Sequence, residues 1–369
     1  MPYKRYELPA FPCKADMWDE LKSSNRPLII YGMGNGADKL IERLKKYGLE
    51  PSDIFASDGF VRGHSFHGMR VKSFSQICEL YDDFIILVSF ATKREEVIGL
   101  IKEYSDRYDV YIPDMPIAKE EYFDRELYNQ HYEEIAEAYN TLSDEYSRSL
   151  YCAVLHYKLT GRIEYLLPLC SDTEEIYRML PEEKIEGYID VGAYNGDTVK
   201  EALKYLSNLK YITAVEPDRK NFKRLEKTVQ KEGIEACLKN AAAWCEDTDG
   251  SFSSSGNRNS TAVATASHEH TSELVKFRKI DSIAKHRVDL LKYDVEGAEY
   301  EALVGSEQTI TKNKPCLLVS LYHRSEDIYA LINYLRAKYR DYDFYLRRTL
   351  CIPAWELNLI MLPRGEKKK

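Results

Sequence analysis

The sequence lacks the features that would place the protein in a membrane, outside the cell or on nucleic acid. No window holds the ~20 consecutive apolar residues of a membrane-spanning helix, and the first ten residues contain no apolar signal core. Lys and Arg number 52 against 60 Asp and Glu, so the formal net charge is −8 and the basic excess typical of nucleic-acid binding is missing. We therefore expect a cytoplasmic protein with no membrane span and no nucleic-acid partner.

The sequence also lacks the cysteine spacing of a disulfide framework or a zinc site. Its eight cysteines are scattered, and none of them forms a C-x-x-C pair. Two short histidine pairs occur, one at His64 and His67 and the other at His268 and His270. Neither pair has further ligands at a readable spacing, so we expect no metal site.

What the sequence does contain is the composition of a globular protein with more than one core. Hydrophobic residues make up 44% of the chain and charged residues 30%, and 369 residues are enough for about two domains. Strands alternate with helices between residues 27 and 114, only helical patterns follow, and the alternation then resumes. We predict an N-terminal Rossmann-like domain at 1–117, a helical connector at 118–180 and a second domain at 181–369.

The alternation of strands and helices sets the expected fold class. It is typical of parallel sheets, so we predict an α/β protein with two doubly wound Rossmann-like domains joined by a helical connector. Two strands at 344–350 and 356–362 have no helix between them, which indicates an antiparallel hairpin at the edge of the second sheet. We also expect one continuous helix at 298–309 and an extra strand at 274–280. The Ser-, Asn- and Thr-rich stretch at 249–271 is expected to be a loop, either a flap over a substrate pocket or an ordinary solvated segment.

Residues 188–198 give the strongest functional signal in the sequence. An apolar strand ends in an acid, a glycine turn follows, and a helix begins. Because Gly192 and Gly196 carry no Cβ, the backbone can approach a ligand closely, and the first N–H groups of the helix point toward it. The next strand ends at Glu216, twenty residues after Gly196, where a doubly wound sheet places an acid against a ribose. The pattern predicts a site for a cofactor that contains a nucleoside.

Three features favour S-adenosylmethionine (SAM) over a dinucleotide such as NAD at this site. Gly192 and Gly196 are separated by three residues, a spacing that departs from G-x-G-x-x-G. Asp190 ends the strand before the turn, where a carboxylate would repel a pyrophosphate. Asp294 and Glu296 bring further acids to the same edge of the sheet. Carboxylates at this edge suit a cofactor with a sulfonium and an ammonium group, because opposite charges attract.

Five segments of the sequence resemble the FkbM family of SAM-dependent methyltransferases. They occur in family order, at residues 188–198, 214–218, 238–242, 279–282 and 291–299. The resemblance covers residues 145–345. It implies a class I methyltransferase fold with a seven-stranded sheet in the C-terminal domain. It also implies methyl transfer to an oxygen of a sugar, glycan or small natural product, so that the partner is a small-molecule or carbohydrate acceptor.

The family motifs carry over to particular cofactor-binding residues. By this resemblance, the residues expected to bind SAM are Asp190, Gly192, Asn195, Gly196, Asp197, Thr198, Glu216, Pro217, Asn240, Ala241 and Asp294. The residues of the first motif would hold the methionine end of SAM. Glu216 would contact the ribose, and Asn240 and Ala241 would lie near the adenine.

The resemblance also implies that Asp294, Glu296 and His323 face the acceptor. A base within ~3 Å of the acceptor hydroxyl could help to remove its proton. Asp294 or Glu296 is the preferred candidate for this base, and His323 is the third. A structural role stays open for each of them, since Glu296 could favour the start of the next helix through its charge and His323 could simply end a strand.

A second glycine turn occurs near the N-terminus. Gly32, Gly34 and Ala37 fit G-x-G-x-x-[GA] between a predicted strand and a predicted helix, with Gly36 in the same turn and Asp58 at the end of the next strand. The pattern is typical of a dinucleotide or nucleotide-sugar site. The alternative, which we favour slightly, is a turn that serves helix–strand packing and binds nothing.

Two functions other than methyl transfer stay open at this point. One is a NAD-dependent oxidoreductase or a nucleotide-sugar-binding protein that uses the N-terminal glycine turn. The other is a noncatalytic interaction module that keeps SAM as a structural ligand. The sequence does not give the oligomeric state, and a homodimer is among the options.

Overall fold

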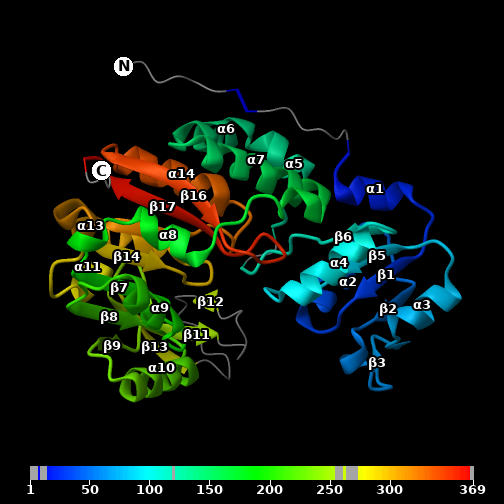
Figure 1. Cartoon of the computed structure of the whole chain (residues 1–369), viewed down its shortest axis with the longest axis horizontal. Helices are drawn as coiled ribbons and strands as arrows, with labels where there is room; N and C mark the ends of the chain where they lie inside the picture. Colours follow the sequence, from blue (N-terminus) through cyan, green and yellow to red (C-terminus); the bar gives the residue numbers. More distant parts are fainter. Residues whose placement is uncertain (1–6, 9–14, 119–120, 254–260, 263–272, 366–369) are drawn as a thin grey trace.

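The computed structural model describes residues 7–8, 15–118, 121–253, 261–262 and 273–365 of the chain. A four-stranded sheet and a seven-stranded sheet lie in different parts of the molecule. The helices of residues 125–160 lie above the region where these parts meet (Figure 1). None of the helices within the described ranges is long and apolar enough to cross a membrane.

The N-terminal sheet is fully parallel, with the strand order β2-β1-β5-β6. Its strands are β1 (Leu28–Tyr31), β2 (Asp53–Phe55), β5 (Ile85–Val88) and β6 (Asp109–Tyr111). Its helices are α1 (Met17–Ser23), α2 (Asn35–Lys46), α3 (Phe74–Leu80) and α4 (Glu95–Ser105), and the short elements η1 (Asp58–Phe60), β3 (Ser65–Phe66) and β4 (Met69–Arg70) precede α3. Neighbouring residues of β1 point to opposite faces, so that Ile30 packs with α1 and α2 while Ile29 packs with α3 and α4. Helices therefore cover both faces of this sheet.

Residues 125–179 form helices without strands, as the apolar periodicity predicted. They are α5 (Arg125–Gln130), α6 (Tyr132–Thr141), α7 (Glu145–Thr160) and α8 (Thr173–Met179), with the 3-10 turns η2 (Ile163–Tyr165) and η3 (Glu182–Lys184) nearby. Asp124, Asp144 and Asp172 accept a backbone N–H at the starts of α5, α7 and α8. Helix α7 ends at Gly161, whose left-handed backbone (φ 64°) favours glycine.

The C-terminal sheet has seven strands in the order β16-β17-β15-β14-β7-β8-β9. These are β7 (Gly187–Val191), β8 (Tyr211–Val215), β9 (Cys237–Lys239), β14 (Leu290–Tyr293), β15 (Cys316–Ser320), β16 (Tyr342–Arg348) and β17 (Leu357–Pro363). Strand β17 runs antiparallel to both β15 and β16, while the other pairs are parallel. The predicted seven-stranded sheet with a hairpin at its edge is confirmed.

Helices cover both faces of the C-terminal sheet as well. Its helices are α9 (Asp197–Tyr205), α10 (Arg219–Glu232), α12 (Glu299–Val304), α13 (Glu307–Asn313) and α14 (Asp327–Lys338). Tyr188 and Leu290 pack with residues of α8, α9 and α10, whereas their neighbours Ile189 and Leu291 share a cluster with residues of α12, α13 and α14. The strand order reverses at β7: β8 and β9 follow on one side of it, and β14 and β15 lie on the other. In an open α/β sheet, ligands bind above the carboxyl ends of the strands at such a point.

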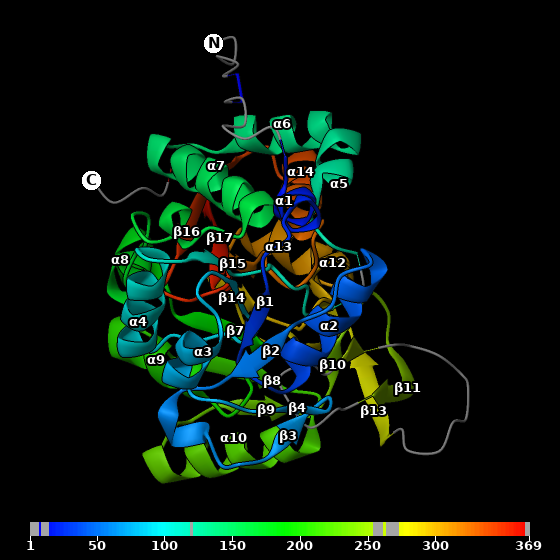
Figure 2. The ribbon, with the colours of Figure 1, turned by 90° about the vertical axis from the view of Figure 1, so that its right-hand side faces the viewer.

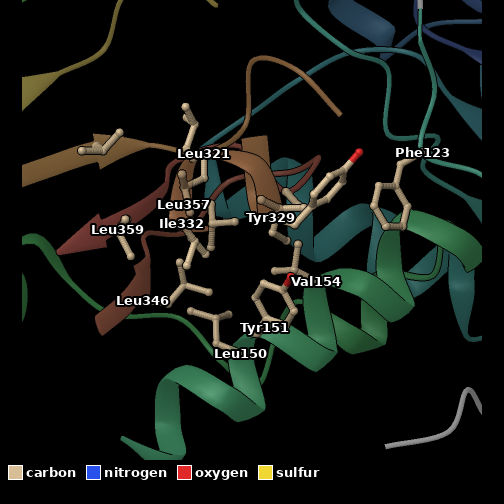
Figure 3. Close-up of a cluster of buried hydrophobic side chains, with 14 of the residues drawn as sticks. Phe123, Leu150, Tyr151, Val154, Leu321, Tyr329, Ile332, Leu346, Leu357 and Leu359 are labelled. Carbon is tan, nitrogen blue, oxygen red and sulfur yellow. The ribbon is translucent and has the colours of Figure 1, made fainter. Parts of the chain in front are cut away.

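One continuous cluster of buried side chains links the two sheets. It contains Ile86 of β5, Tyr157 of α7 and Leu291 of β14. Figure 3 shows its middle part, where Leu150 and Val154 of α7 approach residues of α14, β16 and β17. Because interiors are close-packed, this core fixes the N-terminal sheet against the C-terminal one.

The helix expected at 298–309 is interrupted, so the prediction of one continuous helix was wrong. Helix α12 ends before Gly305, and α13 begins after Ser306. A Cβ on Gly305 would lie 1.9 Å from the carbonyl oxygen of Trp244, and the carbonyl of Gly305 accepts an N–H from Asp281 at 3.0 Å. These contacts with other segments draw the backbone out of the helix, and helical periodicity does not reveal them.

The prediction of a loop from residue 249 was also wrong in part. A small third sheet contains β10 (Ala242–Ala243), β11 (Thr248–Ser253), β12 (Thr261–Ala262) and β13 (Glu273–Arg278), and it stands at one side of the molecule (Figure 2). Strand β13 confirms the extra strand expected at 274–280, and the short helix α11 (Ile280–Ile283) follows it. The rest of the suggested flap, at 254–260 and 263–271, lies outside the described residues, as do His268 and His270.

Candidate active site

A cavity of about 190 Å³ lies at the carboxyl ends of β7, β8, β14 and β15. Eight of the candidate residues line it, namely Gly192, Asp197, Thr198, Glu216, Pro217, Ala241, Asp294 and Glu296. The other lining residues are Lys93, Tyr194, Val215, Asp218, Asn221, Ala242, Ala243, Val295, Ala298, Tyr322 and Glu356. The structure therefore gathers residues from both halves of the chain at one opening.

The turn after β7 lines the cavity, and only glycine fits at the start of this turn. Gly192 has a φ of 92°, and a Cβ there would lie 1.9 Å from the carbonyl oxygen of Asp294. The N–H groups of Gly192 and Ala193 both donate to the carbonyl of Val215. Gly196, with a φ of 87°, then precedes the first residue of α9. The turn is thus fixed against β8 and β14.

Glu216 follows β8 and is held by the turn. Its side chain is buried (6% exposed), and its two carboxylate oxygens accept N–H groups of Tyr194 and Asp218, each at 2.9 Å. Burial raises the pKa of the Glu216 carboxyl to about 8, although these two hydrogen bonds lower it. Asn240 donates to the carbonyls of Glu216 and Pro217, so it supports this segment and does not line the cavity.

A largely enclosed lysine that the sequence analysis missed, with a side chain 13% exposed, connects two of the predicted acids. Lys292 of β14 lies opposite Asp190 of β7 in the parallel register, and its Nζ lies 3.9 Å from Oδ1 of Asp190 and 3.3 Å from Oδ2 of Asp294. Asp190 also accepts a hydrogen bond from the hydroxyl of Thr198. Burial would lower the pKa of Lys292, but Asp294 and Asp190 raise it above its ordinary value. A lysine inside the apolar run of β14 was the signal that could have revealed this role.

Asp294 has three polar side chains around its carboxylate. Its Oδ1 accepts a hydrogen bond from the hydroxyl of Tyr322 at 3.0 Å and lies 3.4 Å from Nε2 of His323. Its Oδ2 accepts from Lys292 at 3.3 Å. Burial would raise the pKa of Asp294, but Lys292 and His323 lower it below its usual range. Tyr322, which lines the cavity, was not identified from the sequence.

His323 lies behind the acids and does not line the cavity. Its side chain is 1% exposed, with Nδ1 2.8 Å from Oε1 of Glu299 and Nε2 3.7 Å from Oε2 of Glu296. Burial would lower the pKa of His323, but Glu299, Glu296 and Asp294 raise it to about 10. The ring is therefore an imidazolium at neutral pH, opposite in charge to the acids around it.

Glu296 lines the cavity from a left-handed turn between β14 and α12. Its φ is 54°, an uncommon conformation for a residue with a side chain, and its side chain is 32% exposed. Helix α12 has Ala298 as its N-cap, with no side-chain cap. The turn thus directs a carboxylate to the cavity at the cost of local backbone strain.

The remaining predicted residue of the first motif, Asn195, has a local role. Its side-chain oxygen accepts the N–H of Asp197 at 3.1 Å, just before α9. Asn195 and Gly196 are not among the residues that line the cavity. They shape the turn, while Gly192, Asp197 and Thr198 line the cavity.

The N-terminal glycine turn packs tightly against the end of β5. A Cβ on Gly36 would lie 1.9 Å from the carbonyl oxygen of Ser89, and one on Gly32 would lie 2.4 Å from the ring of Phe90. Ala37 is fully buried, and Asp58 is exposed in η1. Close approach of the backbone therefore accounts for Gly32 and Gly36, while Gly34 (φ 116°) faces open space.

Each of the two N-terminal histidines, His64 and His67, has one polar side-chain partner. Nε2 of His64 lies 2.9 Å from the sulfur of Met33, and Nε2 of His67 lies 2.7 Å from Oδ1 of Asp38. Within the described ranges, no group of three or more His, Cys, Asp or Glu side chains is arranged to hold a metal ion.

One family model and several solved structures are similar to parts or all of this chain. Residues 190–345 match the family model of the methyltransferase FkbM domain. The structure of methyltransferase FkbM from Methylobacillus flagellatus KT shares the fold over 93% of this chain and 92% of that chain, at 19% identity and a TM-score of 0.69. Residues 190–345 are therefore similar to the methyltransferase domain of the FkbM family. No curated protein matches it.

Two other methyltransferase structures overlap only with part of the chain. The match to an rRNA methylase from Streptococcus thermophilus covers 51% of this chain and 92% of that chain, at 14% identity and a TM-score of 0.33. The match to Aeropyrum pernix fibrillarin in complex with S-adenosyl-L-methionine covers 49% of this chain and 68% of that chain, at 12% identity and a TM-score of 0.32. TM-scores this low say nothing about the function of this chain.

Proposed function

We propose that the protein is a SAM-dependent O-methyltransferase whose acceptor is a hydroxyl of a sugar, glycan or small natural product. The observation that carries the proposal is the meeting of four features in one cavity: the Gly192 turn, the Glu216 carboxylate, Asp294 and Glu296. The FkbM domain match supports methyl transfer as the reaction class.

The lining of the cavity fits a donor of this kind. The Gly192 turn leaves no room for a side chain, which allows the backbone to approach a ligand. Glu216 has two carboxylate oxygens in place at the end of β8, where hydroxyl groups of a ribose can donate to them. Ala241 and its two alanine neighbours offer small apolar side chains for the adenine. We propose that Asp190 acts indirectly, by holding Thr198 and Lys292.

SAM supplies a methyl group on a sulfonium, and the cofactor leaves as neutral S-adenosylhomocysteine (SAH). The protein has to place the acceptor oxygen in line with that methyl group, and positioning of this kind accounts for much of the rate. Because Tyr322, Lys292 and His323 hold Asp294 and lower its pKa, we propose that Asp294 orients the acceptor hydroxyl.

We propose Glu296 as the general base that accepts the proton of that hydroxyl. Its side chain lines the cavity and is partly exposed. Its left-handed backbone places the carboxylate there. His323 is then a positioning residue, since its imidazolium lies between Glu296, Asp294 and Glu299 without reaching the cavity.

We also propose the domain boundaries expected from the sequence: a Rossmann-like domain at 1–117, a connector at 118–180 and the methyltransferase domain at 181–369. The parallel N-terminal sheet and the four helices after it support this division.

Calorimetric titration of the purified protein with SAM, SAH and NAD tests the donor. We expect heat with SAM and SAH and none with NAD. A protein that binds NAD in place of both would overturn the proposal. The acceptor is then sought by incubating the protein with SAM labelled at the methyl group and an extract of its own cells, followed by mass spectrometry of the labelled product.

A further inference from the structure

Lys93 belongs to the N-terminal half of the chain, yet its side chain lines the cavity. It lies between β5 and α4, far outside the matched residues 190–345. The loop is fastened to the connection between β16 and β17 by two main-chain hydrogen bonds. Thr92 donates its N–H to the carbonyl of Ile352 at 2.8 Å, and Ile352 donates to the carbonyl of Thr92 at 3.0 Å. The backbone itself therefore holds Lys93 at the cavity.

Glu356 of the same connection meets the lysine there. Nζ of Lys93 lies 2.7 Å from Oε1 of Glu356, and the two side chains are 52% and 27% exposed. Glu356 has a left-handed backbone with a φ of 63°. As at Glu296, a strained backbone conformation positions a carboxylate at the cavity.

The charges around the cavity make Lys93 distinctive. Among the described lining residues it is the one lysine or arginine, against the acidic side chains of Asp197, Glu216, Asp218, Asp294, Glu296 and Glu356. The sulfonium and ammonium groups of SAM suit these acids, but the carboxylate of its methionine part does not. That carboxylate requires a cation or a set of N–H donors. Lys292 lies between Asp190 and Asp294 and does not line the cavity, whereas Lys93 lines it and can exchange its one ion-pair partner, Glu356, for a ligand.

The strand order indicates which end of the donor Lys93 can reach. Glu216 follows β8, and Ala241 lies beside it near β9, so the nucleoside part belongs on this side of the Gly192 turn. Lys93 and Glu356 enter from the side of β15 and β17, across the turn. With the ribose at Glu216, the amino-acid part of SAM extends toward Lys93.

We propose that Lys93 binds the carboxylate of the methionine part of SAM, exchanging Glu356 for it. The donor site is then built from both halves of the chain, and the N-terminal part supplies a cation that none of the described lining residues from 190–345 supplies. The inference rests on the proposed SAM donor and deepens it.

The test compares SAH with decarboxylated SAH, which lacks only the carboxylate, in calorimetric titrations of the full-length protein. We expect Lys93→Ala to bind SAH ~10-fold more weakly than wild type, because a hydrogen bond to a charged group is lost. The same variant should bind decarboxylated SAH as wild type does. Lys93→Arg should recover most of the affinity for SAH, since it restores the cation.

Two controls separate a direct contact from a structural effect. Arg94→Ala removes the next cation of the same loop, whose side chain is exposed and paired with Glu96, and it should leave both affinities unchanged. Glu356→Gln removes the competing carboxylate, so SAH should bind as tightly as in wild type or more tightly. A loss in Glu356→Gln as large as that in Lys93→Ala would mean that the pair only shapes the loop, and would overturn the inference.

The remaining outcomes distinguish this inference from the proposed function. Equal loss of SAH and decarboxylated SAH in Lys93→Ala, or no loss of SAH, would refute a contact with the carboxylate while leaving the SAM donor in place. Wild-type protein that binds neither compound would instead refute the donor itself.

Discussion

The molecule contains two glycine turns of similar design, and the side chains around them differ. Each turn follows a parallel strand and leads into a helix, and each contains a glycine whose Cβ would lie 1.9 Å from a carbonyl oxygen of a neighbouring strand end. Around the turn after β7, Glu216, Asp294 and Glu296 line a cavity. After β1, Asp58 at the next strand end is exposed in η1. The glycines of such a turn thus indicate close backbone packing, whereas acidic residues at the neighbouring strand ends indicate a ligand site.

The sharpest way to separate the two turns is to substitute one glycine in each. Gly192→Ala places a Cβ against the carbonyl of Asp294 at a φ of 92°, so we expect a loss of ~4 kcal/mol in the free energy of unfolding and no measurable SAH binding. Gly34→Ala meets no atom within 4 Å, so only its left-handed backbone is penalised, by ~1–2 kcal/mol. Urea denaturation and calorimetry measure both effects. An equal loss of SAH binding in Gly34→Ala would move the donor to the N-terminal turn.

Much of the C-terminal site could be predicted from local patterns. The strand, glycine turn and helix of 187–205 follow from apolar alternation and turn chemistry. Parallel strands end at one edge, so Glu216 and Asp294 were expected near each other, and both line the cavity. The same rule applied to the register would have paired Lys292 with Asp190.

What the sequence could not reveal depends on contacts between distant segments. Lys93 and Glu356 are separated by more than half of the chain, and neither has a local pattern that links it to the cavity. His323 lies in the connection after β15, and only the packing of α12 beside it places Glu299 at its Nδ1. The break at Gly305 likewise comes from its contact with Trp244.

The pH dependence of stability tests the buried charges behind the C-terminal turn. The folded-state pKa of His323 is about 10, above the ~6.5 of an unperturbed histidine. The folded protein therefore binds the extra proton more tightly, and this stabilisation is complete below pH 6.5 and is lost as the pH rises toward 10. We expect the free energy of unfolding of wild type to fall across this range, and His323→Gln to reduce the fall.

His323→Gln should also destabilise the protein by ~3 kcal/mol at pH 6, because buried acids lose their partner. In the N-terminal part, His67→Gln removes an exposed pair with Asp38 and a ring contact with Phe66, and it should change the free energy of unfolding by less than ~0.5 kcal/mol. Urea denaturation at several pH values gives both results. A wild-type profile that rises between pH 6.5 and 10 would contradict the charged state assigned to His323.

The next comparison is between Glu216, which follows β8, and Asp58, which follows β2. Glu216→Ala removes the carboxylate proposed for the ribose, so SAH should bind ~10-fold more weakly, the equivalent of ~1.4 kcal/mol. Asp58→Ala changes an exposed side chain of η1 and should leave SAH binding unchanged. Calorimetric titration measures both. An unchanged dissociation constant in Glu216→Ala would remove the proposed ribose contact.

The smallest expected effect concerns two helix-capping residues, one in the C-terminal part and one in the N-terminal part. Asp218 accepts N–H groups of Lys220 and Asn221 at the start of α10, and Ser73 accepts the N–H of Gln76 at the start of α3. Replacing either by alanine should cost ~1 kcal/mol in the free energy of unfolding, because a capping hydrogen bond is lost. Of the two residues, only Asp218 lines the cavity. Asp218→Ala should therefore weaken SAH binding a few-fold as well, whereas Ser73→Ala should not. Equal stability losses with unequal SAH affinities would show that the C-terminal turn serves a ligand in addition to the fold.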